Sequence, residues 1–215
     1  MLYEPPHFKH DERVDALALI DAHPLATLVS MADGEPVISH APLQAQLRGE
    51  RVVLIGHLAK PNPQWRAWEA GPQTGARVTA IFHGPNSYIS PAWYELPEAV
   101  PTWNYMVVHA EGTATTQHDS DAKEAVLKRL IDAHDPPYHA HWNEALSAEY
   151  RERMKRGIVA FEIAVDRWRV KFKLSQNRSA FDKASVLAHM ERAEAPRAAD
   201  RRELGAWMRR LGIGT

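Results

Sequence analysis

Short apolar runs separated only by tight turns are the feature that most constrains the fold of this chain. Residues 25–31 and 36–43 are two such runs, and Asp33-Gly34 between them favours the positive φ angles of a two-residue hairpin. A third run, residues 51–57, follows a glycine turn directly. Because parallel strands need long crossover connections, turns this short predict an antiparallel meander.

Three further segments have strand character: residues 76–83, 104–115 and 158–165, the last continuing in an extended conformation to residue 174. Together with the meander they give about six antiparallel strands, a number that can close a small barrel. We therefore predict a β-rich α+β fold built around such a barrel.

Helical spacing of apolar residues places helices between and after the strands. Asp121 and Glu124 are spaced as a capping box, and Asn143 is expected to cap a second helix that Gly157 ends. A first helix is expected between a cap at Asp11 and the stop at His23-Pro24, and the later predicted helices are residues 62–71, 121–134, 143–156, 179–194 and 197–211. This predicts one barrel domain over residues 1–195, with helices inserted at about 119–156, and a helical tail over 196–215.

Composition narrows the possible chemistry. The 215 residues are 45% hydrophobic with a net charge of −1, so a substantial core is expected, and no chain-wide basic field indicates nucleic acid. There is no cysteine, which excludes disulfides, thiolate nucleophiles and cysteine metal sites. No apolar run approaches membrane-spanning length, and the cytoplasm is the expected location. The sequence also lacks the hydrolase, P-loop and Rossmann motifs.

The third strand runs directly into a candidate phosphate site. Asn62 is expected to cap a helix with Pro63 in its first turn and Gly71 at its end, so that backbone N–H groups and the Lys60 ammonium face outward together. An ordinary capped helix whose tryptophans pack on the sheet is the alternative, and it is the commoner arrangement.

Two other stretches concentrate ligand-binding side chains. Two cations and two amides, which could bind a phosphate or the carbonyl edge of a ring, leave the last strand together; they are Lys173, Gln176, Asn177 and Arg178. A helix cap explains the same residues equally well. At the start of the fifth strand, Trp103 and Tyr105 alternate with Asn104, so the aromatics either wall a flat ligand or plug the barrel.

Histidine is abundant, with 12 residues, and residues 134–141 contain three of them. Their spacing matches no standard zinc site, and the prolines there are expected to prevent a helix that would gather the rings. We therefore predict no metal site.

Several motifs, in this order, resemble those of the PaiB-type FMN-binding negative transcriptional regulators, which have the split-barrel fold of the pyridoxamine 5′-phosphate oxidases. The matching stretches are Met1-x-Tyr3-x-Pro5-x-x-Phe8, His57-Leu-Ala-Lys-Pro-Asn-Pro-Gln-Trp65, Tyr88-Ile-Ser-Pro-x-Trp-Tyr94, Val100-Pro-Thr-Trp-Asn-Tyr105 and Lys173-Leu-Ser-Gln-Asn-Arg178. The resemblance implies a split β-barrel of about six antiparallel strands with peripheral helices. It also implies a homodimer with FMN at the subunit interface.

The same resemblance implies roles for individual residues. It places the FMN phosphate at Lys60 and at the helix start from Asn62 to Gln64, and the ribityl chain and ring along Ser39, His40 and His57. Trp103, Asn104 and Tyr105 would approach the flavin from a neighbouring strand. The late motif, with Lys173, Gln176, Asn177 and Arg178, would reach it from the second subunit.

Three functions remain open from the sequence. The first is a flavin-binding regulator, in which any direct DNA contact would fall to the basic helices 143–156 and 197–211. The second is a flavin oxidoreductase, for which His40, His57 and Tyr105 are proton-donor candidates by location only, so no residue is assigned as catalytic. The third is a haem protein, which would need an axial histidine.

Overall fold

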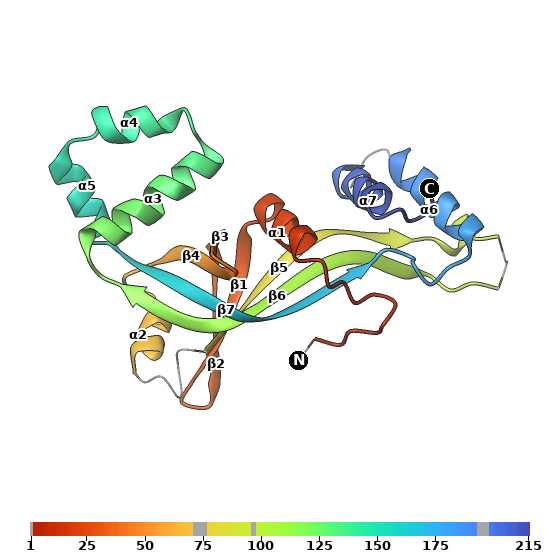
Figure 1. Cartoon of the computed structure of the whole chain (residues 1–215), viewed down its shortest axis with the longest axis horizontal. Coiled ribbons are helices and arrows are strands. Elements are labelled where there is room, and N and C mark those ends of the chain that lie inside the picture. The colour runs from red at the N-terminus through yellow and green to blue at the C-terminus, as the bar shows by residue number, and fades with distance from the viewer. Residues whose placement is uncertain (1, 71–76, 96–97, 193–197) are drawn as a thin grey trace. The chain divides into compact units, whose positions relative to one another are not determined.

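The computed structural model describes residues 2–70, 77–95, 98–192 and 198–215, and the strands of these residues form one antiparallel sheet (Figure 1). The strand order within the described part of the chain is β2-β1-β5-β6-β7-β4-β3. The strands are β1 (Leu25–Ala32), β2 (Glu35–Pro42), β3 (Gln44–Arg48), β4 (Arg51–Ala59), β5 (Arg77–Ile89), β6 (Thr102–Gln117) and β7 (Ile158–Lys173).

The first hairpin confirms the turn chemistry expected from the sequence. Strands β1 and β2 pair in antiparallel register from Leu25↔Pro42 to Ala32↔Glu35, leaving a two-residue loop. In that loop Asp33 has φ 52° and Gly34 has φ 84°, as a two-residue hairpin turn requires.

Strand β3 is absent from the sequence prediction. It pairs with β4 from Gln44↔Ile55 to Arg48↔Arg51, so the described sheet has seven strands where about six were expected. The later predictions were in the right places: β5 and β6 extend beyond the predicted segments, and β7 covers the predicted segment and its extended continuation up to Lys173. Ala76, the predicted first residue of the fourth strand, lies outside the described residues.

The chain divides into two compact units. Unit 1 comprises residues 1–16, 83–108 and 169–215, and unit 2 comprises residues 17–82 and 109–168. The long strands β5, β6 and β7 each contribute residues to both units. Each unit has a buried core: Leu28, Leu54, Phe82, Phe161 and Ile163 are fully buried in unit 2, and Ile89, Phe172, Leu174 and Met190 are fully buried in unit 1.

Seven α-helices lie within the described residues. They are α1 (Arg13–Ala22), α2 (Gln64–Glu69), α3 (Ser120–His134), α4 (Tyr138–Glu144), α5 (Ala148–Lys155), α6 (Ala180–Glu191) and α7 (Ala198–Arg210), with a 3₁₀ turn at Pro91–Trp93. In unit 1, α6 packs against α7 through Met190, Leu204 and Met208 at a shared buried surface (Figure 1). No helix in the described part of the chain is long and apolar enough to cross a membrane.

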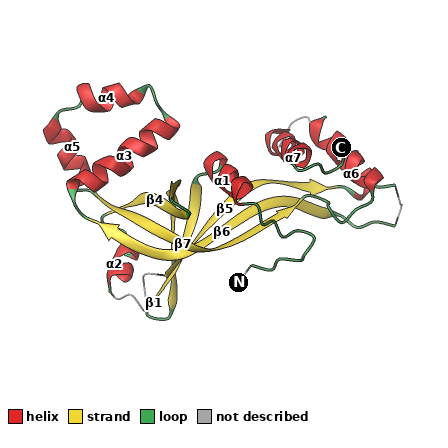
Figure 2. Cartoon of the chain, viewed as in Figure 1, coloured by secondary structure: helices red, strands yellow, loops and turns green. Residues whose placement is uncertain are grey.

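Helices α3, α4 and α5 follow one another in unit 2, joined by short loops (Figure 2), and they correct three sequence predictions. The cap of α3 is Asp119, whose Oδ1 accepts from Ala122 N at 2.8 Å, so the predicted capping box at Asp121 was wrong. The single helix predicted over residues 143–156 is instead two, with Asn143 inside α4 and Ser147 capping α5.

The prolines of residues 134–141 also act differently from the prediction. They do not prevent a helix, because Pro137 has helical φ and ψ angles and stands immediately before α4. A proline is tolerated at a helix start, where its missing N–H would have no partner in any case. His139 and His141 therefore lie on a helix, and no group of three or more potential metal ligands occurs among the described residues.

Candidate functional site

The predicted site residues fall into two groups, one in each unit. Unit 2 holds Ser39, His40, His57, Lys60, Asn62 and Gln64, and unit 1 holds Trp103, Asn104, Tyr105, Lys173, Gln176, Asn177 and Arg178. Each group is described separately below.

In unit 2, Asn62 organises the approach to α2. Its Oδ1 accepts from Gln64 N at 2.9 Å, and its Nδ2 donates to Ser39 Oγ at 2.8 Å on β2. Asn62 thus bonds to the first N–H group of α2, which begins at Gln64, although the residue at the N-cap position is Pro63. One of the N–H groups expected to face outward is thereby occupied, and Gly71, the predicted helix end, lies outside the described residues.

The side chain of Gln64 is fully buried. Its Nε2 donates to Ser30 Oγ at 3.0 Å, to Val37 O at 3.0 Å and to Leu28 O at 3.3 Å. These bonds tie the first residue of α2 to both strands of the first hairpin. Gln64 therefore fixes where the Lys60-to-Asn62 segment lies.

Two histidines of this group differ in environment. His57, on β4, has a buried Nδ1 with no hydrogen-bond partner among the described residues, and burial lowers the pKa of its imidazole. A histidine with a lowered pKa is neutral near pH 7, with one ring nitrogen as donor and the other as acceptor. His40, on the exposed side of β2, contacts Thr27 Oγ1 through Nδ1 at 3.1 Å.

Lys60 has a cationic neighbour that sequence reasoning missed. Lys123, near the start of α3, is only 9% exposed, and the structure gives its ammonium group no hydrogen-bond or ion-pair partner among the described residues. Burial and the nearby charge of Lys60 lower the pKa of Lys123. Helix α3 packs against β4, the strand that leads into Lys60, which brings two cations to the same region of unit 2.

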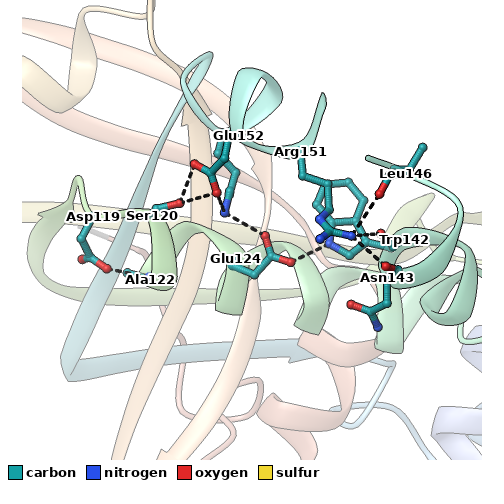
Figure 3. A network of polar contacts seen from close by, with 10 residues as sticks. Asp119, Ser120, Ala122, Glu124, Trp142, Asn143, Leu146, Arg151 and Glu152 are labelled. Carbon is teal, nitrogen blue, oxygen red and sulfur yellow. Dashed lines mark hydrogen bonds and ion pairs between the residues drawn. The ribbon is translucent and has the colours of Figure 1, made fainter. Parts of the chain in front are cut away.

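The nearby carboxylates are occupied elsewhere (Figure 3). Lys155 Nζ lies 3.1 Å from Glu124 Oε2 and 2.5 Å from a carboxylate oxygen of Glu152, which also accepts from Ser120 Oγ. Lys155 thus forms ion pairs with both glutamates. Asp119 caps α3. None of these carboxylates forms an ion pair with Lys60 or Lys123, although the charges of Asp119 and Glu152 act on Lys123 from nearby. The two ammonium groups are therefore suited to an anionic ligand.

In unit 1, Asn104 is fully buried beside Ser175, which follows β7. Asn104 Nδ2 donates to Ser175 Oγ at 3.1 Å, and Ser175 Oγ lies 3.2 Å from Asn104 Oδ1. Ser175 has φ 67°, a left-handed conformation that is rare for a residue with a side chain. Asn104 therefore turns into the sheet and holds the turn after β7.

The aromatic neighbours of Asn104 are not barrel plugs. Trp103 is 43% exposed, and its ring meets the Tyr88 ring edge-on at 6.2 Å. Tyr105 is partly buried, with Lys171 Nζ 5.3 Å from its ring centre. The exposed Trp103 face in particular can contact a flat ligand.

The late motif surrounds the turn after β7. Lys173 Nζ donates to Thr102 Oγ1 and, at 2.8 Å, to Trp103 O; burial, followed by the charges of Lys171 and Arg178, lowers its pKa. Gln176 is engaged locally, with its Oε1 accepting from Leu174 N at 2.7 Å. Asn177 is exposed, and Arg178 is partly buried.

The residues missed from the sequence share one property, which is that their contacts are not local. Lys123 lies 63 positions beyond Lys60, so no local spacing connects the two cations. Ser175 gave no signal because a left-handed residue is expected to be glycine or asparagine. A cation on the buried face of a predicted helix, as at Lys123, is the one sequence signal that could have been used.

The donors present in unit 2 fit the phosphate of FMN. A phosphate monoester needs charge-assisted donors, and Lys60 and Lys123 provide two without competing ion pairs among the described residues. The unpartnered His57 Nδ1 and Gln64 Oε1 are polar atoms that a bound ligand or water could satisfy.

Comparison with known proteins agrees with this reading. A family model described as "Putative FMN-binding domain" matches residues 2–167. Over 206 residues the chain is 33% identical to the Protease synthase and sporulation protein PAI 2 of Bacillus subtilis (strain 168), covering 94% of this chain and 96% of that protein.

Solved structures share the fold at lower identity. The FAD and heme binding protein of Mycobacterium smegmatis superposes with a TM-score of 0.58 at 23% identity, covering 77% of this chain and 73% of that chain. The flavocytochrome Anf3 of Azotobacter vinelandii gives a TM-score of 0.57 at 15% identity, covering 77% and 69%. At these identities the likeness concerns the fold alone.

Proposed function

Because the chain belongs to the PaiB-type family of FMN-binding split-barrel proteins, we propose that it is a homodimer that binds FMN and acts as a negative regulator of transcription. FMN is the cofactor that the family model indicates. When bound, FMN supplies reversible electron transfer, while the protein supplies binding and orientation. A regulatory role draws support from the match to PAI 2 across almost the whole of both chains.

The observation that carries FMN binding is the pair of cations in unit 2. Lys60 and Lys123 would hold the phosphate. The hydrogen bond from Asn62 to Ser39 would fix the segment from Lys60 to Asn62 against β2. Gln64 acts as a positioning residue, since its amide donates hydrogen bonds to both strands of the first hairpin. His57 and His40 would lie along the ribityl chain and ring.

The unit 1 group is proposed as the wall of the flavin ring. Trp103 and Tyr105 offer flat surfaces, and Asn104 supports them from inside the sheet. In the homodimer, Lys173, Gln176, Asn177 and Arg178 of one subunit would reach the flavin of its partner. An exposed tryptophan next to a cluster of cations suits a flat, anionic ligand.

Repression through a protein partner fits the surface better than direct DNA contact. On α5, Arg151 donates to three backbone carbonyls and Lys155 is paired with two glutamates (Figure 3). On α7, Arg201 bonds to Ser87, and Arg210 pairs with Asp15 at 2.6 Å. Most of the basic side chains expected to contact phosphates are therefore engaged within the protein.

Flavin titration of the purified protein tests the cofactor assignment. Wild type should bind FMN more tightly than riboflavin, which lacks the phosphate. Lys60→Gln should weaken FMN about tenfold or more while leaving riboflavin affinity unchanged, because it removes one charge-assisted contact. Lys128→Gln, a lysine of α3 outside the site, is the matched control. Equal loss of FMN and riboflavin would contradict the phosphate assignment.

Sedimentation and DNA binding test the other two parts. The protein should sediment as a dimer, and a monomer at micromolar concentration would contradict the shared site. A mobility shift against its own upstream region, repeated over a range of salt, measures direct DNA contact. We expect no shift without a partner; a shift that weakens steeply with salt would instead show a basic footprint.

A flavin oxidoreductase is the second candidate, and His57 favours it. A buried imidazole that is neutral near pH 7 and has an unpartnered nitrogen can serve as a general base or acid toward a substrate. Turnover of NAD(P)H or oxygen by the FMN-loaded protein, lost in His57→Gln with flavin binding intact, would favour this reading over the regulator.

A further inference from the structure

A pocket of about 460 Å³ lies in unit 2, where the end of α1, strand β3 and the end of α3 meet. Small-molecule sites in proteins have volumes of about 300–1,000 Å³, so the pocket has room for a small ligand. Its lining includes the apolar residues Leu17, Pro24 and Leu47 and the polar residues Asp21, Gln44 and His134.

The apolar lining can hold the body of a ligand. Leu17 and Pro24 are partly buried, and Leu47, on β3, is 59% exposed. A ligand that covers Leu47 would remove apolar surface from water, which is favourable.

The polar lining consists of hydrogen-bond acceptors and one negative charge. Among the described residues that line the pocket, Asp21 alone carries a formal charge when His134 is neutral. A carboxylate, the amide oxygen of Gln44 and a neutral imidazole can each accept a hydrogen bond. The structure gives none of these three side chains a hydrogen-bond or ion-pair partner among the described residues.

The end of α1 adds to the negative potential at the pocket. Asp21 stands in the last turn of α1, and that turn has no basic residue. The helix dipole disfavours a negative charge at this end of a helix and favours a positive one. Pro24 has no N–H, so the carbonyl group of Ile20 lacks the donor that a continuing helix would supply. A cation in the pocket would therefore interact favourably with both Asp21 and the helix end.

We propose that this pocket binds a small organic cation, a protonated primary amine attached to an apolar body. The ammonium group would donate its three hydrogens to Asp21, Gln44 and His134, while the body lies against Leu17 and Leu47.

The amine site is separate from the proposed flavin site. None of the residues assigned to the flavin lines the pocket, and its described lining contains no lysine or arginine to hold a phosphate. Amine binding therefore does not depend on flavin. Only the use of the amine as a signal to the regulator would rest on the proposed function.

Calorimetric titration of the flavin-free, full-length protein with hexylamine, hexan-1-ol and hexanoate tests the proposal, because the three probes share one apolar chain and differ in the charge of the head group. We expect saturable binding of hexylamine, binding of hexan-1-ol about tenfold weaker or more, and no binding of hexanoate. The absence of saturable hexylamine binding, or equal affinity for hexan-1-ol, would overturn the proposal. If FMN itself fails to bind, this titration still decides the matter.

Asp21→Asn separates a ligand role from a structural one. The variant should bind hexylamine about tenfold more weakly, while its melting temperature without ligand equals or exceeds that of wild type, because a negative charge is removed from the C-terminal end of α1. Asp121→Asn is the matched control: it changes an exposed carboxylate in the first turn of α3, outside the pocket, and should bind hexylamine like wild type. Unchanged affinity in Asp21→Asn would contradict the assignment.

Ala45→Trp tests the place of the site. Ala45 is an exposed lining residue on β3, so an indole there should fill the pocket and abolish hexylamine binding while FMN affinity and sedimentation stay as in wild type. Unchanged hexylamine affinity would put the amine elsewhere. A change in sedimentation would show that this surface belongs to the contact between subunits, and either result overturns the proposal.

Discussion

Asn104 and Ser175 are hydrogen-bonded to each other in the interior of unit 1: the serine hydroxyl lies 3.1 Å from Nδ2 and 3.2 Å from Oδ1 of the asparagine amide. The serine is left-handed, with φ 67°, so this contact fixes a backbone conformation that its own side chain disfavours. Two residues 71 positions apart thus determine the turn from which the late motif projects.

That relationship predicts an order of stabilities for two variants. Ser175→Ala removes the bond to a buried amide and keeps the backbone strain, so it should lower the free energy of unfolding by about 1–3 kcal/mol. Ser175→Gly loses the same bond but relieves the strain, so it should cost about 1 kcal/mol less. Urea denaturation measures both. If the two variants are equally stable, the left-handed conformation carries no cost.

Lys123→Met should change stability and flavin affinity in opposite directions. Removing a cation that burial and the charge of Lys60 disfavour should raise the free energy of unfolding of the flavin-free protein by about 1 kcal/mol, while FMN affinity falls and riboflavin affinity does not. Lys128→Met is the control on the same helix. Thermal melting and fluorescence titration provide the two readouts. A variant that loses stability and binds both flavins equally poorly would show that Lys123 is structural only.

Gln64 should be needed for the fold around the phosphate site. Gln64→Met leaves the carbonyls of Leu28 and Val37 without their side-chain donor, at a cost of about 1–3 kcal/mol. Gln64→Glu should cost more, since a buried carboxylate brings charge and no donor. Gln46→Met on β3 should stay within about 0.5 kcal/mol of wild type. Urea midpoints decide the ranking, and a stable Gln64→Met would contradict it.

His57 should make the protein less stable in mild acid. Burial lowers its pKa in the folded state, so below about pH 6.5 the unfolded chain takes up the proton first and the free energy of unfolding falls. That loss continues until the pH passes the lowered folded pKa. His57→Gln should flatten the decline between about pH 7 and pH 5.5, as measured by urea denaturation at each pH. An unchanged slope would show that His57 titrates normally.

Any substitution of Gly112 that adds a side chain should destabilise the protein. A Cβ built on it would lie 2.2 Å from Ala164 O, a backbone atom of β7 in unit 2. Gly112→Ala must therefore push two strands apart, at a cost of about 1–3 kcal/mol or more. Gly205→Ala in α7 is the control, because its Cβ would lie 3.3 Å from Met190 Cβ, and we expect a smaller loss in melting temperature. Similar losses in both variants would contradict the close approach at Gly112.

The strand framework could be predicted because its turns are local. Asp33-Gly34 specifies a two-residue hairpin through four neighbouring residues, and the structure has that hairpin in the expected register. Strand β3 was missed although its five residues, QAQLR, alternate polar and apolar side chains, because the alternation is short and its apolar members, alanine and leucine, are neither β-branched nor aromatic. Its strand character comes from pairing with β4, which supplies the hydrogen bonds.

Helix boundaries and charge partners were harder for a related reason. Asn143 and Ser147 are both good capping residues, and only the packing of α4 and α5 decides that Ser147 is used. Lys123 comes near Lys60 only because α3 packs against β4, and no spacing in the sequence shows that packing. The residue-by-residue flavin contacts stay predictions for the titrations above.

The division of the chain between the two units sets an order of events during synthesis. Unit 2 is complete once residue 168 has left the ribosome, whereas unit 1 needs residues 169–215 as well. The amino-terminal segment pairs only then, when His10 N reaches Val170 O at 3.0 Å and Phe172 N reaches Phe8 O at 3.0 Å. Phe8 and His10 are therefore made before unit 2 but acquire these partners only after it, and they remain unpaired while unit 2 forms.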